Sequence, residues 1–241
     1  ESEPWLKLKQ AQALPRGWFG SYGQLLANRD ERRNLLIGTL LAIAGVVGLW
    51  AVGEYAVDLQ DAVFTTYFAA QNPGGDVAAQ VAQAKNWAYL LQMVGGAVGM
   101  LIFTYIADRY GRRPAFTIGF SAAFVSTLFV YWRLETPTDA YWMMPLMGAA
   151  QLSVFAGFSI YLPELFGARV RGTGVSFAYN LGRFAAAGGS FVSALLSTRL
   201  FAGFAAPAPL RYSAMVMCAV FLLGIVASRF APETRGRALR D

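Results

Sequence analysis

Six stretches of about twenty residues, almost free of charged side chains, constrain this chain more than any other feature of its sequence. The sixth, Gly172–Thr198, contains a single charged residue, Arg183. The other five are charge-free: Leu35–Gly53, Asn86–Ala107, Pro114–Trp132, Ala140–Pro163 and Tyr212–Ser228. Since about 20 apolar residues in a helix cross a hydrocarbon core of roughly 30 Å, each stretch predicts a membrane-spanning helix. We therefore expect an all-α membrane protein with six transmembrane helices.

The composition argues in the same direction and excludes several kinds of chemistry. Only 14% of the residues are charged, against about 25% in a typical soluble domain, so buried helices of a large soluble protein are the weaker interpretation. Histidine is absent, which removes Ser-His, Cys-His and His-metal sites. The one cysteine, Cys218, lies in an apolar stretch and suits packing. We expect no enzyme activity, no metal and no cofactor.

Basic residues alternate in density between successive connections. The segments 1–34, 108–113, 164–171 and 229–241 hold 15 Lys and Arg, whereas the connections on the opposite side hold four. The positive-inside rule then places both termini in the cytoplasm. Because the positive charges lie in short turns between helices, the pI near 9.6 reflects membrane topology, and we expect the lipid bilayer, not nucleic acid, as the partner.

The predicted organisation has three parts. Residues 1–34 form a cytoplasmic segment in which 18–33 make a surface amphipathic helix, 35–229 form the six-helix domain, and 230–241 form a cytoplasmic tail. The connection 54–85 is long and contains the turn signal Asn72-Pro73-Gly74-Gly75, and we expect the second helix to begin before its apolar part. The start at Glu1 instead of Met predicts a processed chain, a fragment or an incomplete start.

Three charged turns carry a family resemblance. Asp108-Arg109-Tyr110-Gly111-Arg112-Arg113 resembles the signature loop of the major facilitator superfamily, Gly-x-x-x-Asp-Arg/Lys-x-Gly-Arg/Lys-Arg/Lys, although Thr104 stands at the leading Gly position. Pro163-Glu164-Leu165-Phe166, followed by Arg169, Arg171 and Gly172, resembles the turn between the tenth and eleventh helices of many members. Pro232-Glu233-Thr234-Arg235-Gly236 resembles the stretch after the twelfth helix of sugar-porter-like members.

The resemblance implies half of a transporter. Members have two six-helix halves with the solute bound between them near the midplane, and the order of the motifs here matches the C-terminal half. We expect an N-terminal half, or other membrane subunits, as partner. The alternative is a six-helix relative that does not transport and serves as a scaffold subunit of a larger membrane complex.

The charged turns predict a network at one membrane face. Carboxylates and guanidinium groups at helix ends form charge-assisted pairs there, and we hypothesise that they clamp one conformation of an alternating-access cycle. Topology anchors that only obey the positive-inside rule are the alternative. The candidate residues are Asp108, Arg109, Gly111, Arg112, Arg113, Glu164, Arg169 and Arg171.

Arg183 lies 11 residues after Gly172, so about 16 Å into the membrane at 1.5 Å per residue. An arginine at that depth is costly and usually faces a bundle interior or a wet cavity, where it suits a carboxylate. The predicted substrate-binding residues are Arg183, Asn180, Tyr179, Gln151 and Gln92. A structural ion pair with the other half is the alternative for Arg183, and inter-helix hydrogen bonding for the two glutamines. Gly95, Gly96 and Gly99 predict close helix packing.

The predicted function is secondary active transport of a small organic anion by alternating access in the plasma (bacterial inner) membrane. The stretch Tyr179-Asn180-x-Gly182-Arg183 resembles the eleventh helix of the branch that carries lactate, sialate and aromatic acids with protons. Glu54 is the candidate proton site, because desolvation could raise the pKa of a carboxyl near the far interface. An ionised, interfacial Glu54 and a proton site in the other half remain alternatives.

Overall fold

The computed structural model describes residues 20–72 and 75–237, and every regular element in them is a helix. This confirms the all-α class. The helices in chain order are α2 (Gly20–Ala27), α3 (Arg29–Val46), η1 (Val47–Val52), α4 (Tyr55–Gln71), α5 (Val77–Tyr110), α6 (Arg112–Arg133), α7 (Pro137–Leu165), α8 (Arg171–Leu195), η2 (Leu196–Leu200), α9 (Ala208–Met217) and α10 (Val220–Phe230).

The first predicted span is part of a much longer helix. α3, the π-helical η1 and α4 run together as Arg29–Gln71, 43 residues or about 65 Å at 1.5 Å per residue. Asn28 caps its start by accepting hydrogen bonds from Asp30 N and Glu31 N. The predicted surface helix over 18–33 is therefore too long: α2 ends at Ala27, and 29–33 begin the long helix.

The predicted long connection 54–85 is mostly helical. Gly53 and Glu54 keep right-handed helical backbone angles, so α4 follows directly, with Leu59 and Phe64 buried and Asp58 and Asp61 exposed. The predicted turn joins α4 to α5, although residues 73–74 of it lie outside the described part of the chain. As expected, the next helix begins before its apolar part, at Val77.

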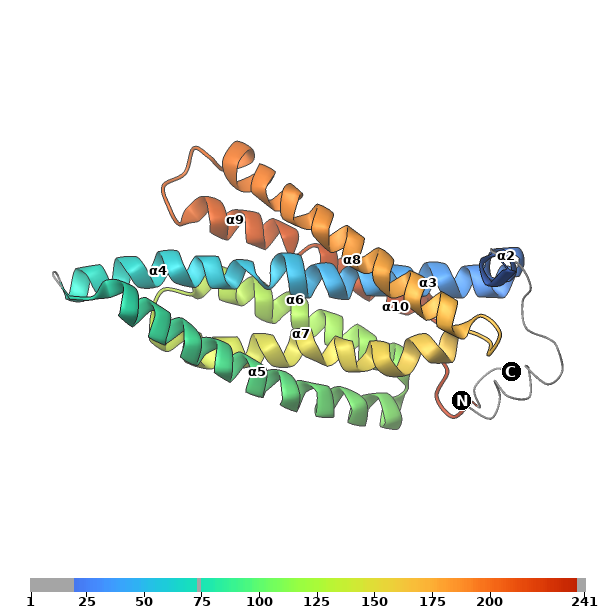
Figure 1. Cartoon of the computed structure of the whole chain (residues 1–241). Coiled ribbons are helices and arrows are strands. Elements are labelled where there is room, and N and C mark those ends of the chain that lie inside the picture. Colours follow the sequence, from blue (N-terminus) through green and yellow to red (C-terminus); the bar gives the residue numbers. More distant parts are fainter. Residues whose placement is uncertain (1–19, 73–74, 238–241) are drawn as a thin grey trace.

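The helices pack as a bundle with two distinct ends (Figure 1). At one, the hairpin end, α4 meets α5. At the other, the turn end, α5 meets α6, α7 leads to α8, and α10 finishes. Within the described residues, five helices are long and apolar enough to cross a membrane: Arg29–Gln71, Val77–Tyr110, Arg112–Arg133, Pro137–Leu165 and Ala208–Phe230. α8 spans 25 residues but does not join this set, because polar side chains such as Asn180 and Arg183 interrupt it.

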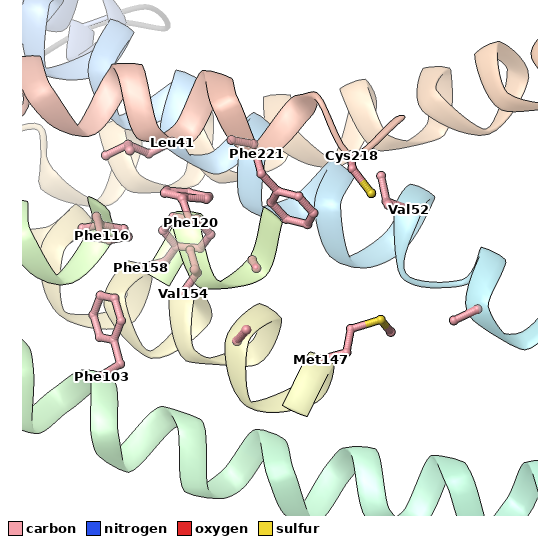
Figure 2. Packing of buried hydrophobic residues seen from close by; sticks show 14 of the residues in the cluster. Leu41, Val52, Phe103, Phe116, Phe120, Met147, Val154, Phe158, Cys218 and Phe221 are labelled. Carbon is pink, nitrogen blue, oxygen red and sulfur yellow. The ribbon is translucent and has the colours of Figure 1, made fainter. Parts of the chain in front are cut away.

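Glycines let α5 and α7 approach closely. A Cβ on Gly99 would lie 2.0 Å from Ala149 O, and one on Gly95 would lie 2.1 Å from Pro145 O, which confirms the predicted small-residue packing. The core beside this pair is aromatic (Figure 2). The Phe116 ring contacts those of Phe103 and Phe158 at centroid distances of 5.2 and 5.7 Å, so α5, α6 and α7 share one aromatic core.

Candidate functional site

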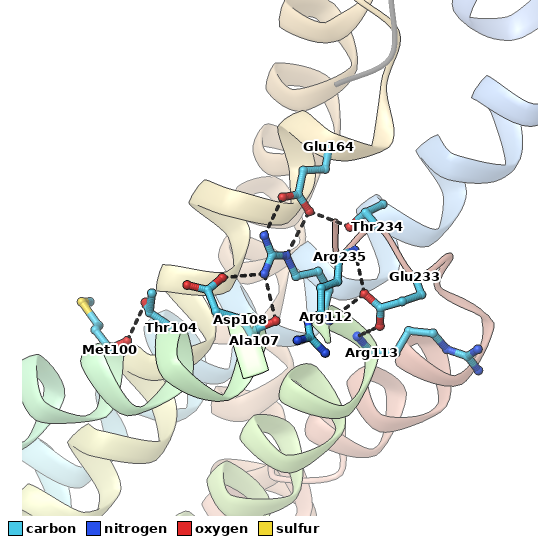
Figure 3. A network of polar contacts seen from close by, with 10 residues as sticks. All are labelled: Met100, Thr104, Ala107, Asp108, Arg112, Arg113, Glu164, Glu233, Thr234 and Arg235. Carbon is cyan, nitrogen blue, oxygen red and sulfur yellow. Dashed lines mark hydrogen bonds and ion pairs between the residues drawn. The ribbon is translucent and has the colours of Figure 1, made fainter. Parts of the chain in front are cut away.

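The charged turns meet at the turn end around the guanidinium of Arg112, at the start of α6 (Figure 3). Its Nη2 and Nε donate to the two carboxylate oxygens of Glu164 in α7, at 2.8 and 3.1 Å. Its Nη1 donates to Asp108 Oδ1 at 2.8 Å and to Ala107 O at 2.9 Å, both in α5. Such a two-point pair fixes geometry as well as charge, so one side chain joins three helix ends.

The segment after α10 closes the network. Glu233 Oε1 accepts from Arg112 N and Arg235 N, both at 2.9 Å, and its Oε2 accepts from Arg113 N at 3.1 Å. Thr234 Oγ1 donates to Glu164 Oε2 at 2.6 Å. The network predicted from the sequence does not include Glu233 and Thr234. Both belong to the motif 232–236 after the last helix, and their acidic and hydroxyl side chains are the signal that could have identified them.

Glu233 is held in its ionised form. Partial burial of the carboxyl raises its pKa, but hydrogen bonds from the backbone N–H groups of Arg112, Arg235, Arg113 and Thr234 outweigh burial and leave the pKa below its ordinary value. A carboxylate at the start of α6 also suits the positive end of the helix dipole.

Gly111 makes the turn possible. Its φ of 107° and ψ of 165° lie in a region that is essentially restricted to glycine. A Cβ there would also stand 2.5 Å from Glu233 Oε2. The residue therefore serves the turn and leaves room for the carboxylate.

The remaining predicted members lie at the edge of the network or outside it. Arg171 Nε donates to Pro163 O and Phe166 O at 3.1 and 3.3 Å and so holds the end of α7. Arg109 and Arg169 are exposed and pair with no described carboxylate. Arg109 follows Asp108 by one residue, about 100° around the helix, so the two side chains do not share a face. Thr104 stands where the family motif has its leading glycine, and its hydroxyl donates to Met100 O at 2.9 Å.

A second candidate site is a cavity of about 240 Å³ between the long helix Arg29–Gln71 and α8. Its lining residues are Val46, Trp50, Glu54, Arg183, Ala186, Ala187 and Ser190. It unites Arg183 with Glu54, the predicted proton site, and places opposite charges on facing helices. The π-helical η1 contributes Trp50 here, and π-helical turns are frequent at functional sites.

The other predicted binding residues lie elsewhere. Gln151 is buried inside the bundle, where its Nε2 donates to Thr127 Oγ1 at 2.9 Å, as its inter-helix interpretation predicts. Gln92 is buried where α5 meets α7. Tyr179 is half-buried, and the exposed Asn180 donates to Ser176 O at 2.8 Å. Across the described residues, no group of side chains has the arrangement of a metal site.

Long apolar helices joined by this charged network define a polytopic α-helical membrane protein. The family described as "Sugar (and other) transporter" matches residues 20–241. The chain belongs to this family, a sugar-porter-like branch of the major facilitator superfamily. The prediction of a transport protein, and not an enzyme, agrees with its relatives.

Two curated relatives are similar over part of their length. A probable 4-methylmuconolactone transporter from Cupriavidus pinatubonensis is 26% identical over 216 residues, 89% of this chain and 45% of the relative. A putative metabolite transport protein from Haemophilus influenzae is 27% identical over 146 residues, 60% of this chain and 34% of the relative. The chain thus spans about half the length, or less, of the curated relatives it matches.

Solved structures share the fold. A partially occluded, inward-open form of the xylose transporter XylE from E. coli superposes with a TM-score of 0.64 and 18% identity, over 84% of this chain and 50% of XylE. An inward-open form of XylE gives 0.60 and 20%, over 83% of this chain and 47% of that one. The correspondence with half of a transporter agrees with the order of the motifs.

Proposed function

We propose that the chain is the C-terminal six-helix half of a secondary transporter that moves a small organic anion by alternating access. In this proposal α8 completes the six spans, both termini lie in the cytoplasm of a bacterial inner membrane, and the solute binds between this half and an N-terminal half. Family membership supports transport over a scaffold role, because the charged turns of the family are intact and joined to one another.

The observation that carries the anion proposal is the cavity shared by Arg183 and Glu54. In this proposal an exposed guanidinium on α8, about 18 Å from the helix start at Arg171 at 1.5 Å per residue, lies on the side that a partner half would cover. A carboxylate substrate would give that guanidinium a two-point partner in a region of low dielectric. The cavity adds an indole and a hydroxyl, from Trp50 and Ser190, which suit the body of a small organic acid.

Glu54 supports proton coupling as a refinement of this proposal. A carboxylate in the same cavity would compete with an anionic substrate for Arg183, and its protonation would relieve that competition. Binding of the anion and uptake of a proton would then favour each other. The network around Arg112 would hold the turn end closed in one state of the cycle and open in the other.

The names of the relatives leave the substrate open. One is a probable 4-methylmuconolactone transporter and another fold relative is a xylose transporter, so one architecture serves chemically different solutes. The charge of Arg183 favours an acid over a neutral sugar, and this choice is open to direct test.

The test is uptake by the intact transporter in proteoliposomes, with a panel of radiolabelled monocarboxylates and, in parallel, xylose. We expect carboxylate uptake that Arg183→Gln reduces at least tenfold and that a pH gradient drives. Arg199→Gln, at an exposed position of η2 outside the cavity, is the matched control and should transport normally. Sugar uptake that is indifferent to Arg183→Gln would contradict the proposal.

A further inference from the structure

A groove at the turn end borders the charged network, with which it shares Arg113 and Glu233. It has a volume of about 440 Å³ and runs between the start of α6 and the end of α10. Its lining residues are Arg113, Pro114, Thr117, Ile118, Ser228, Arg229 and Glu233. Two guanidinium groups therefore border a cavity that takes no part in the Arg112–Glu164 pair or in the cavity around Arg183.

The groove sets two guanidinium groups against one carboxylate, so its net charge is positive. Arg113 Nη2 donates to Arg229 O at 2.5 Å, which ties the side chain to the groove and leaves its other N–H groups for a ligand. The Arg229 side chain is exposed and meets no described carboxylate. Glu233 is the one acidic residue in the lining, and backbone N–H groups already occupy both of its oxygens.

A hydrogen bond between α6 and α10 fixes the floor of the groove. Thr117 Oγ1 and Ser228 Oγ lie 2.7 Å apart in a hydrogen bond that joins α6 to α10. Each hydroxyl also donates to, or lies within hydrogen-bond reach of, a carbonyl of its own helix, Arg113 O at 3.0 Å and Ile225 O at 2.8 Å. The two helices are therefore pinned together below the arginines, and the cavity between them has a defined shape.

The surface below the arginines is apolar. Ile118 and Val125 of α6 and Leu222 and Val226 of α10 are 50%, 64%, 44% and 55% exposed. On each helix the exposed pair follows the groove at helical spacing, so both pairs continue its face. The exposed face of α8 is mixed, because it carries Asn180, Arg183 and Ser190 together with exposed apolar side chains such as Phe184 and Phe191.

We propose that this groove binds the headgroup of an anionic phospholipid. The guanidinium groups of Arg113 and Arg229 hold the phosphate by charge-assisted hydrogen bonds. The acyl chains lie along Ile118, Val125, Leu222 and Val226. Charge at the helix ends and apolar surface toward the bundle centre follow the order of a phospholipid, and basic pockets between membrane helices are typical sites for such headgroups.

The experiment measures lipid retention by the intact transporter with native mass spectrometry. The purified protein is titrated with phosphatidylglycerol, and separately with phosphatidylcholine and with inorganic phosphate. We expect phosphatidylglycerol to bind about tenfold more tightly than phosphatidylcholine, which is the effect of one charge-assisted hydrogen bond. Arg229→Gln should abolish most of that preference. Arg133→Gln, an exposed arginine at the opposite end of α6, should keep it.

Two results would overturn the lipid proposal, and they can be told apart from each other. Equal retention of both lipids would mean a non-selective lipid shell and would overturn the proposal. Displacement of phosphatidylglycerol by inorganic phosphate at similar concentration would assign the groove to free anions and would overturn the lipid assignment. Arg113→Gln gives a second variant, and its circular dichroism and gel-filtration profile show whether a loss of lipid reflects a loss of fold.

Discussion

Arg112 places one guanidinium against two carboxylates and a backbone carbonyl, with its side chain only 13% exposed. Lysine keeps the charge but has no planar fork for the two oxygens of Glu164. We therefore expect Arg112→Lys to lower the free energy of unfolding by about 1.5–3 kcal/mol and to slow transport.

Thermal unfolding in detergent and uptake in proteoliposomes measure both effects of Arg112→Lys. The matched control is Arg109→Lys, three residues away, exposed and outside the network. If the two variants unfold and transport alike, the network contributes only positive charge to that membrane face.

Glu233 makes the stability of the turn end depend on pH. Its pKa is lower in the folded chain than its ordinary value of 4.5, so the stabilisation is complete above that value and is lost as the pH falls through the folded pKa. Glu233→Gln should therefore unfold at a lower temperature than the parent near pH 7, and the gap should shrink between about pH 5 and 3. A gap that stays constant over this range would show that ionisation of Glu233 contributes nothing.

The backbones of α5 and α7 lie against each other at their glycines. Because a Cβ on Gly99 would meet the backbone at Ala149 O, the helices must separate to accept Gly99→Ala, at a cost of about 1–3 kcal/mol. Gly188→Ala in α8 meets nothing within 4 Å and should be neutral or slightly stabilising, because alanine favours helix. Folded yield and melting temperature in detergent measure both; similar losses in the two variants would contradict this account of the contact.

Sequence reasoning located the helices better than their ends. Charge-free stretches marked where the described helices cross the bundle, because burial in lipid excludes charge. They missed the continuation through Gly53 and Glu54, since an amphipathic helix can carry Asp58 and Asp61 on its exposed side without ending. They also missed the break at Cys218 and Ala219 that separates α9 from α10, which leaves no mark in hydropathy.

The candidate sites were predictable to different degrees. The motifs named most of the charged network, although only three-dimensional contact shows that Thr234 and Glu233 complete it. Arg183 stood out because charge is rare in a span. That Arg183 and Glu54 line one cavity depends on how the 43-residue helix packs on α8, and Gln92 and Gln151 occupy other interfaces for the same reason. The helical period of 3.6 residues shows which residues share a face, but not which neighbouring helix that face contacts.

The described bundle presents two outer faces that differ in polarity. The face at α8 carries Arg183 and Ser190 beside exposed apolar side chains such as Phe191, whereas the face at α6 and α10 below the arginines is apolar. In the intact transporter the first should border a water-filled path and the second should border lipid. Cys218 is buried, so a new cysteine reports its own surroundings. Ser190→Cys should react quickly with a hydrophilic maleimide and be protected by substrate, whereas Leu222→Cys, 44% exposed before substitution, should react slowly. Mass spectrometry of the labelled protein gives both rates; equal rates would contradict the assignment of the faces.

The length of the 43-residue helix means that a small tilt at one end would displace the other end by a large distance. Trp50 and Glu54 sit near its middle, and its far tip lies at the hairpin end, beside the start of α5. A tilt of about 10° around one end would displace the other by roughly 11 Å, for a rod of about 65 Å. A small tilt at the turn end would thereby become a large displacement at the hairpin end. A spin label or fluorophore near Gln71, at this tip, would therefore report such a tilt during transport.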